Sequence, residues 1–244
     1  MDVFNIRLLS VNGKHHLSPM SGVLFHGFLN REIPNRLSHR LHSSQVPLFH
    51  QKFKFYQQTV DWQIISFDHE VSESIRQIIM TKDRIHLKHK QLTLKLVSAT
   101  ESVTQSLSDW LLGIQALNLQ TKDCFVNITT PTSHKVKGEY LGEFNLEVVY
   151  KHIIRKMNLL QQTIYIGEDS LKLLMEGTQI CKLATKAQTI QLKGIKIPAY
   201  TGNVQLRWNG EEGSLPVFNL LWLFAEMSGV GIKTSMGYGN VNLL

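Results

Sequence analysis

Gly229-Val230-Gly231-Ile232-Lys233-Thr234-Ser235-Met236-Gly237-Tyr238-Gly239 is the stretch around which the chain is organised. Its four glycines form two Gly-apolar-Gly pairs, and glycine adopts positive φ without steric penalty and lets a ligand approach closely. This spacing predicts a shaped loop whose N–H groups form a concavity for anions, to which Lys233 adds a positive charge. A plain glycine-rich turn before a last strand is the alternative interpretation.

Two well-known glycine motifs do not fit this stretch. A P-loop requires Gly-x-x-x-x-Gly-Lys-Ser/Thr between a strand and a helix, whereas Lys233 follows Ile232 and the stretch follows an apolar, helix-like segment. The dinucleotide fingerprint Gly-x-Gly-x-x-Gly fails because its sixth position is Thr234, and it also needs a helix downstream. A nucleotide-dependent transferase that uses this loop for a triphosphate is therefore a weak alternative.

The composition is that of a globular protein with a basic surface. The 244 residues include 26 Lys and Arg against 19 Asp and Glu, which gives a formal net charge of +7. A basic balance attracts polyanions, so nucleic acid is the leading candidate ligand. The two cysteines show neither metal spacing nor a disulfide framework, which favours a cytoplasmic location. The N-terminus lacks the apolar core of a signal peptide, and residues 215–227 are too short an apolar segment for a membrane span.

The alternation of apolar and polar residues in the first half predicts an α+β fold. Strands are expected over 3–11, 52–56, 61–67 and 85–97, and helical segments over 21–42, broken near Pro34, and over 71–79. This order, β-α-β-β-α-β, is that of a ferredoxin-like unit.

The same order recurs after a helix-like connector at 106–117. Strand signals are found over 124–130, 178–208 and 238–244, and helical faces over 146–160 and 215–227. We therefore predict two tandem ferredoxin-like (RRM-like) domains, residues 1–120 and 121–244.

One basic stretch, residues 179–198, holds four lysines and no acidic residue. Lys193 and Lys196 alternate with apolar residues, which predicts that they lie on the solvent side of strands. There they could follow an RNA backbone. A solvated edge strand, protected by lysine against aggregation, is the alternative.

Three further segments carry a resemblance together with residues 229–239. They are Thr130-Pro131-Thr132-Ser133-His134-Lys135, Pro198-Ala199-Tyr200-Thr201-Gly202-Asn203-Val204, and Leu41-His42 some ten residues before a lysine-rich strand. In a basic double-ferredoxin chain, these segments resemble the CRISPR-associated repeat-processing endoribonucleases (the Cas-six family), which belong to the repeat-associated RNA-binding proteins. The similarity extends over nearly the whole chain and is more specific in its C-terminal half.

The resemblance implies metal-independent cleavage of CRISPR precursor RNA within each repeat, with no cofactor. A ribose 2′-hydroxyl attacks the adjacent phosphorus and the 5′-oxygen leaves. The products are a 2′,3′-cyclic phosphate (or 3′-phosphate) and a 5′-hydroxyl. The 2′-hydroxyl restricts such an enzyme to RNA. The reaction needs a base, an acid and cations beside the developing phosphorane.

Histidine suits the acid–base role because its usual pKa, about 6.5, lies near working pH. The resemblance favours His42 as the general acid or base. His26 is the second candidate, and it could instead contact RNA or lie half-buried on its helix. Lys52 and Lys54 share one face of a strand, and either, Lys52 first, could stabilise the phosphorane. A solvated strand face is the alternative for both.

The resemblance also implies that the glycine-rich stretch and the basic stretch bind RNA phosphates. The RNA-binding candidates are Gly229, Gly231, Lys233, Ser235, Gly237, Gly239, Lys193, Lys196 and Lys54. Contacts of this kind set the register of the RNA and make its affinity depend on salt, while base contacts or RNA shape supply specificity.

No metal site is expected from the sequence. There is no His-x-x-x-His or Cys-x-x-Cys pair, and His86 and His89 have a spacing that places them on opposite faces of a strand. The expected partner is CRISPR repeat RNA, with an effector complex and a second copy of the chain as further candidates. The main alternative function is a non-catalytic guide-RNA-binding subunit of a CRISPR effector complex.

Overall fold

A computed structural model describes residues 1–11, 13–103, 106–117, 119–161 and 163–244. The chain forms two compact units. Unit 1 comprises residues 1–104 together with 233–237, and unit 2 comprises residues 105–232 together with 238–244. The centre of the glycine-rich stretch therefore belongs to unit 1 and its two ends belong to unit 2. The assignment of separate functions to residues 1–120 and 121–244 stays a prediction.

Unit 1 contains a five-stranded sheet in the order β2-β3-β1-β5-β4, and all neighbouring strands are antiparallel. The strands are β1 (Asp2–Ser10), β2 (Phe49–Phe55), β3 (Thr59–Ser66), β4 (Arg84–Leu87) and β5 (Leu92–Val103). Apart from the short edge strand β4, this is the strand order of a ferredoxin-like unit, so the predicted fold of this half is confirmed.

The single strand expected over 85–97 is instead a hairpin, and this part of the prediction is wrong. A 3₁₀ turn, η2 (Lys88–Lys90), separates β4 from β5. Gln91, which follows the turn, has a left-handed backbone with φ 49°. Periodicity alone does not reveal such a turn, because none of its residues is glycine or proline.

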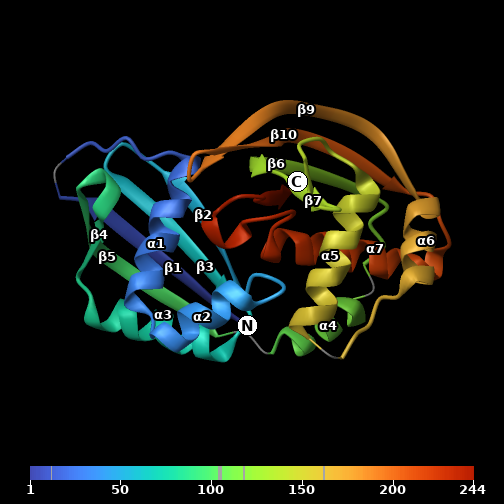
Figure 1. Ribbon diagram of the computed structural model, residues 1–244. Helices are drawn as coiled ribbons and strands as arrows, with labels where there is room; N and C mark the ends of the chain where they lie inside the picture. Colours follow the sequence, from blue (N-terminus) through green and yellow to red (C-terminus); the bar gives the residue numbers. More distant parts are fainter. Residues whose placement is uncertain (12, 104–105, 118, 162) are drawn as a thin grey trace. The chain divides into compact units, whose positions relative to one another are not determined.

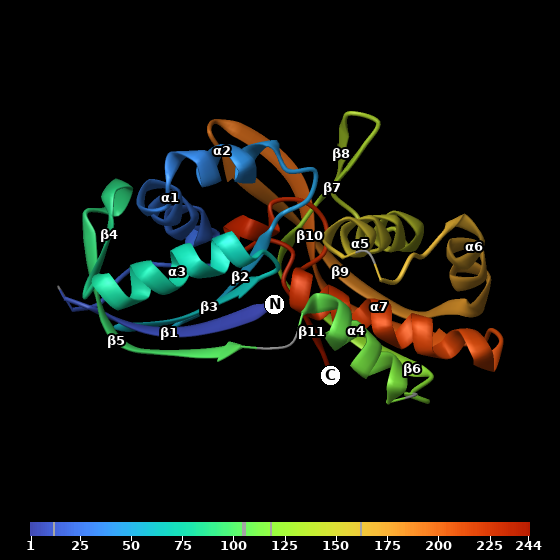
Figure 2. The same cartoon turned by 90° about the horizontal axis from the view of Figure 1, so that it is seen from below.

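Three helices lie on one face of the unit 1 sheet, as Figures 1 and 2 show. They are α1 (Gly22–Glu32), α2 (Asn35–Ser43) and α3 (His69–Thr81), and a 3₁₀ turn, η1 (Pro19–Ser21), precedes α1. Ile33 is extended before Pro34, which ends α1 and lets α2 begin. The core consists of alternate β1 side chains, Phe4, Ile6 and Leu8, packed with apolar side chains of the helices.

Unit 2 repeats this strand order. Its four-stranded antiparallel sheet has the order β11-β6-β10-β9, which again places the last strand beside the first. The strands are β6 (Asp123–Thr132), β9 (Thr178–Leu192), β10 (Ile195–Trp208) and β11 (Val241–Leu243), and a separate hairpin is formed by β7 (His134–Val136) and β8 (Glu139–Leu141). The tandem ferredoxin-like fold is therefore confirmed.

Four helices accompany the sheet of unit 2. They are α4 (Leu107–Ala116), α5 (Leu146–Leu160), α6 (Glu168–Gly177) and α7 (Leu215–Ser228), with a 3₁₀ turn, η3 (Glu212–Ser214), before α7. The sequence analysis did not identify α6. The expected end of α7 is confirmed, because Gly229 has φ 70° and its N–H donates to the carbonyl of Ala225. No helix within the described ranges is long and apolar enough to cross a membrane.

Candidate active site

The centre of the glycine-rich stretch is a short turn held against unit 1. Thr234–Met236 form a 3₁₀ turn, η4, between left-handed Lys233 (φ 61°) and Gly237 (φ 82°). We call residues 233–237 the docked segment. Its carbonyl groups accept hydrogen bonds from α1 and from β2, the edge strand of the unit 1 sheet.

His26 on α1 is the first of these donors. It is 8% exposed, and its Nδ1 donates to the carbonyl oxygen of Ser235 over 3.1 Å. With Nδ1 protonated in the neutral ring, Nε2 accepts from the side-chain amide of Asn30 over 3.0 Å. Burial, together with smaller electrostatic effects of His42 and Lys233, lowers the pKa of His26 to about 4. His26 is therefore neutral near pH 7, and both of its ring nitrogens are engaged.

Two adjacent residues of β2 supply the other donors. The ring of His50 donates through Nδ1 to the Thr234 carbonyl over 3.0 Å, and the Gln51 side-chain amide donates to the Ser235 carbonyl. The Oε1 atom of Gln51 in turn accepts from the indole of Trp62 over 2.7 Å. Sequence reasoning did not identify His50 or Gln51 as site residues, and the only signal was a buried-looking strand that carries polar side chains.

Glycine is required where the docked segment approaches unit 1. A Cβ on Gly22 would lie 2.2 Å from the backbone oxygen of Met236, which no side chain could accommodate. A Cβ on Gly237 would lie 3.0 Å from the ring of Phe53 and would also strain a left-handed backbone. These two glycines therefore allow the segment to dock.

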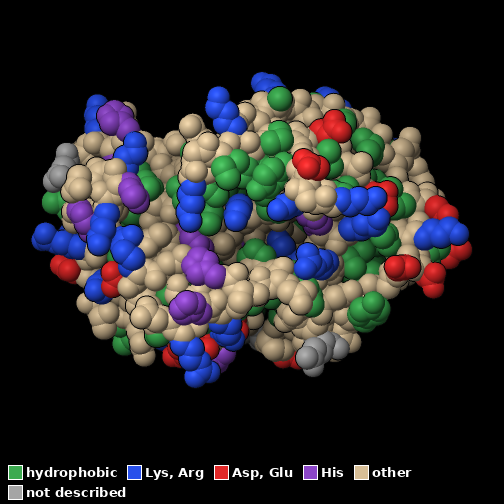
Figure 3. Space-filling view, in the orientation of Figure 1, with side chains coloured by type: hydrophobic (Ala, Val, Ile, Leu, Met, Phe, Trp, Pro, Cys, Tyr) green, Lys and Arg blue, Asp and Glu red, His purple; other side chains and the backbone are tan. Residues whose placement is uncertain are grey.

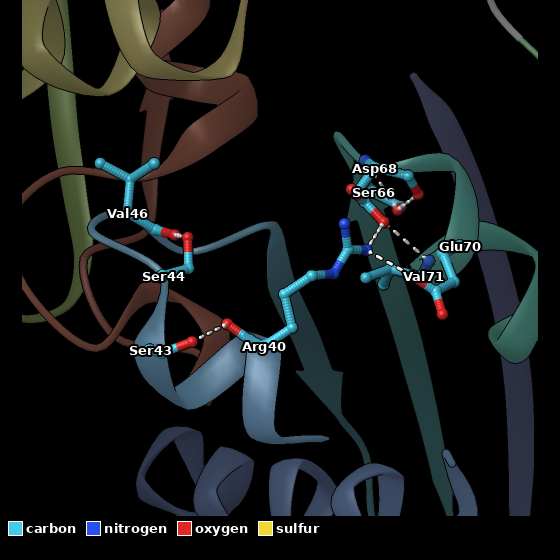
Figure 4. Close-up of polar contacts among 8 residues, drawn as sticks. All are labelled: Arg40, Ser43, Ser44, Val46, Ser66, Asp68, Glu70 and Val71. Carbon is cyan, nitrogen blue, oxygen red and sulfur yellow. Dashed lines mark hydrogen bonds and ion pairs between the residues drawn. The ribbon is translucent and has the colours of Figure 1, made fainter. Parts of the chain in front are cut away.

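His42 lies in the last turn of α2 and is exposed. The same turn is tied to α3 by Arg40, whose guanidinium forms ion pairs with Asp68 and, over 3.2 Å, with Glu70 (Figure 4). Asp68 also caps α3 by accepting from the Val71 N–H over 3.0 Å. The Arg40 side chain thus fixes the end of α2 that carries His42.

The structure brings three of the predicted site residues together. His26 bonds the docked segment that begins with Lys233, and both His42 and Lys233 lower the pKa of His26. Lys52 and Lys54 lie on β2, where Lys52 is half-buried and Lys54 is exposed. Ser235 contributes its carbonyl oxygen to the docking contacts.

The glycines at the ends of the stretch are held inside unit 2. The N–H groups of Gly229 and Gly239 donate to the carbonyls of Ala225 and Pro131. A Cβ on Gly231 would lie 2.3 Å from the backbone oxygen of Ser133. The N–H of Gly237, in unit 1, donates to the Thr234 carbonyl. These glycine amides therefore serve the fold, and the expectation that they point into an anion-binding concavity is wrong for Gly229, Gly237 and Gly239.

A buried lysine supports the same part of unit 2. Lys156 on α5 is 4% exposed, and its Nζ donates to the carbonyls of Ser228 and Gly229 over 2.9 and 2.7 Å. Burial lowers the pKa of Lys156 to about 7. The end of α7 is thus closed by a side chain from another helix.

Two of the sequence segments singled out above meet in the core of unit 2. The Nε2 atom of His134 accepts from the hydroxyl of Tyr200 over 2.9 Å, and its Nδ1 lies 3.0 Å from Nδ1 of His152. Burial lowers the pKa of His134 to about 3. The histidine of one segment and the aromatic residue of the other therefore form one buried network.

The basic stretch forms the long, arched β9–β10 hairpin seen in Figure 1. Lys196 is exposed on β10, as expected. Lys193 is also exposed, but it occupies the turn, where it and Gly194 have φ values of 50° and 82°. The placement of Lys193 within a strand was therefore wrong.

Within the described ranges, no group of three or more His, Cys, Asp or Glu side chains is arranged to hold a metal ion.

Comparisons with known proteins point to one family. A family model described as CRISPR-associated endoribonuclease Cas6 matches residues 126–241. A protein of Streptococcus thermophilus named CRISPR-associated endoribonuclease Cas6 is 26% identical over 228 residues, which cover 91% of this chain and 90% of that protein. Over nearly its whole length the chain is therefore similar to CRISPR-associated endoribonucleases named Cas6.

Solved structures of Cas6 proteins share the fold of this chain. A Cas6 product complex matches with a TM-score of 0.76 at 17% identity, over all of both chains. Cas6 of Thermus thermophilus matches with a TM-score of 0.72 at 14% identity, over 100% of this chain and 98% of that one. The match of the Cas6 family model includes the glycine-rich stretch up to Val241, but it does not extend to His42.

Proposed function

We propose that this chain is a Cas6 endoribonuclease that cleaves CRISPR repeat RNA without a metal ion, and that His42 acts as the general acid or base. The observation that carries the proposal is the bond from buried His26 to the docked segment that begins with Lys233, together with exposed His42 at the end of the next helix, α2. An imidazole open to solvent can exchange a proton with RNA, and a lysine beside it can stabilise negative charge on phosphate.

In the proposed reaction, the 2′-hydroxyl oxygen attacks the adjacent phosphorus, and the bond from phosphorus to the 5′-oxygen breaks. The hydroxyl loses its proton to a base, and the departing 5′-oxygen gains one from an acid. His42 serves one of these two steps. The products are a 2′,3′-cyclic phosphate, or the 3′-phosphate formed from it by water, and a 5′-hydroxyl.

The geometry favours His42 over His26 for this role. His26 already donates to Ser235 and accepts from Asn30, and its lowered pKa, about 4, keeps it neutral. His26 therefore serves the reaction indirectly, by holding the backbone of the docked segment in place. Lys233, at the first position of that segment, is the cation that we assign to the phosphorane, with Lys52 or Lys54 as a second cation on β2.

CRISPR repeat RNA is the partner in this proposal, and a cytoplasmic location follows from that role. The support is the family and its solved product complex. An effector complex and a second copy of the chain remain candidate partners. Lys193 and Lys196, at the exposed end of the β9–β10 hairpin, are proposed to contact RNA phosphates.

The test is cleavage of labelled repeat RNA in EDTA by the wild-type protein and by His42→Ala. We expect cleavage by the wild type, with a loss of about 10²–10⁴-fold in the variant at unchanged RNA affinity. A protein that retains repeat RNA without any cleavage would instead be a guide-RNA-binding subunit. Thermal shifts with ATP and GTP test the transferase alternative, for which we expect no shift.

A further inference from the structure

A second group of basic side chains lies at one end of the unit 1 sheet. It consists of six basic side chains on two segments at this end, which we call the turn-end surface: Lys14, His15, His16, Lys88, His89 and Lys90. In Figure 3, Lys, Arg and His side chains gather at the upper left, over the region where Figure 1 shows the turn between β4 and β5.

Backbone hydrogen bonds place these segments at the same end of the unit 1 sheet. Just after β1, the N–H of Val11 donates to the carbonyl of Thr93 on β5 over 3.1 Å. Further along, the N–H of His15 donates to the carbonyl of Gln57, in the β2–β3 turn, over 3.1 Å. The loop that carries Lys14 therefore runs between the β2–β3 turn and the β4–β5 hairpin.

His15 also fixes the shape of this loop with its ring. Its Nε2 donates to the Thr59 carbonyl over 3.4 Å, and its Nδ1 accepts from the Leu17 N–H over 3.3 Å. The position of the neighbouring Lys14 is thus set by the fold.

The lysines of the turn-end surface are not neutralised within unit 1. Lys14, Lys88 and Lys90 are exposed, and none of them takes part in an ion pair among the described residues. The carboxylate of Asp61 on β3 is occupied by Arg7, with an ion pair of 2.7 Å. Repulsion between these like charges destabilises the folded state. A bound polyanion would remove this repulsion, so it is the ligand that the surface favours.

An exposed aromatic ring accompanies this charge. Tyr56 lies in the β2–β3 turn beside Gln57, which bonds the His15 loop, and it is 50% exposed. Stacking of bases on aromatic rings next to a positively charged track is the usual means of binding single-stranded RNA. From His50 at the docked segment to Tyr56, β2 spans about 20 Å, so one strand joins the cleavage site to this surface.

We propose that the turn-end surface binds single-stranded RNA that flanks the cleaved repeat, with phosphates on Lys14, Lys88 and Lys90 and a base on Tyr56. The identity of this RNA rests on the proposed function. An acidic segment of another protein would meet the same lysines, but it would have no base to stack on Tyr56.

The test uses Lys14→Ala, Lys88→Ala and Lys90→Ala combined. The matched control combines Lys122→Ala, Lys151→Ala and Lys172→Ala, which are exposed lysines of unit 2 and change the net charge equally. Fluorescence anisotropy against salt is measured with the repeat alone, the repeat with a single-stranded flank, and the flank alone. For the flanked repeat we expect about tenfold weaker binding and a salt slope lower by about 2, because each phosphate contact contributes about 0.7. The repeat alone should bind the test variant and the control equally.

Equal affinity of the test variant and the control for the flanked repeat would overturn the proposal. The proposal would also be overturned if the three lysine substitutions weakened the binding of polyglutamate as much as that of the flanked repeat. That result would identify an acidic protein as the ligand. Binding of the flank RNA alone tests the turn-end surface independently of the proposed cleavage activity. If the wild type fails to cleave the repeat, the proposed function fails, whereas loss of flank binding in the test variant still supports the surface.

Tyr56→Leu should weaken binding of the flank, and unchanged binding would show that no base stacks on Tyr56.

Discussion

The Nδ1 atom of His26 lies 3.1 Å from the carbonyl oxygen of Ser235, although 209 residues separate the two in sequence. This contact ties the centre of the glycine-rich stretch to the first helix of unit 1. The contact favours the protonated ring, but burial outweighs it and keeps His26 neutral.

Replacement of His26 by leucine should destabilise the protein by about 1–3 kcal/mol, because the Asn30 amide loses its acceptor and the Ser235 carbonyl loses one of its donors. His26→Gln, whose side chain also carries a donor and an acceptor, should be milder. Urea unfolding measures both variants. Equal stability of His26→Leu and the wild type would show that the contact does not contribute to the fold.

The pKa of His26 also predicts how stability depends on pH. Its folded value, about 4, lies below the usual 6.5, so the unfolded chain takes up a proton first as the pH falls. Stability due to neutral His26 is therefore fully present above pH 6.5 and is lost between pH 6.5 and 4, by about 2 kcal/mol at pH 5. Urea titrations at pH 7 and pH 5 should show this loss, and it should shrink in His26→Gln. His134 contributes in the same direction and is unchanged in that comparison.

The pKa of Lys156 predicts how stability changes at alkaline pH. Its folded pKa, about 7, lies below the usual 10.5, so the unfolded state binds more protons between these values. Thermal stability should accordingly rise as the pH is raised from 7 towards 10. In Lys156→Met this part of the rise should disappear, and melting curves at pH 7 and 9 measure it. An identical pH dependence in the variant would mean that the buried amine is not responsible.

Arg40→Ala should lower the cleavage rate, through the position of His42, more than it lowers the stability of the protein. The ion pairs of Arg40 with Asp68 and Glu70 are partly exposed, so their loss should cost no more than about 1 kcal/mol. The cleavage rate should fall by more than this small loss of stability would cause, because the end of α2 that carries His42 is no longer bonded to α3. The control is Arg207→Ala, which removes a comparably exposed ion pair with Asp123 in unit 2. Single-turnover rates that fall equally in both variants would contradict a positioning role for Arg40.

Much of the fold could be predicted from local sequence signals. The alternation of Phe4, Ile6 and Leu8 identified β1, and Gly229 marked the end of α7. Pro34 correctly divided the first helical region. In each case the signal lies within a few residues of the feature that it predicts.

The contacts that build the site could not be predicted in this way. His50 and Gln51 bond Thr234 and Ser235, and each pair is separated by 184 residues. No local pattern encodes which carbonyl a buried polar side chain meets. The sequence also did not reveal that the amides of Gly229 and Gly239 are used inside unit 2, because glycine spacing indicates backbone freedom but not the direction of an N–H group.

The central claim is that His42 and a ribose 2′-hydroxyl of the RNA perform the cleavage without a metal ion. Its most direct test is single-turnover cleavage in EDTA of repeat RNA that carries one 2′-deoxy substitution at the scissile nucleotide, next to the all-ribose RNA. The account predicts that the wild type cleaves only the all-ribose RNA, and that His42→Ala binds both RNAs and cleaves neither at a comparable rate. Cleavage of the deoxy-substituted RNA at that bond, or cleavage that appears only when a divalent ion is added, would contradict it.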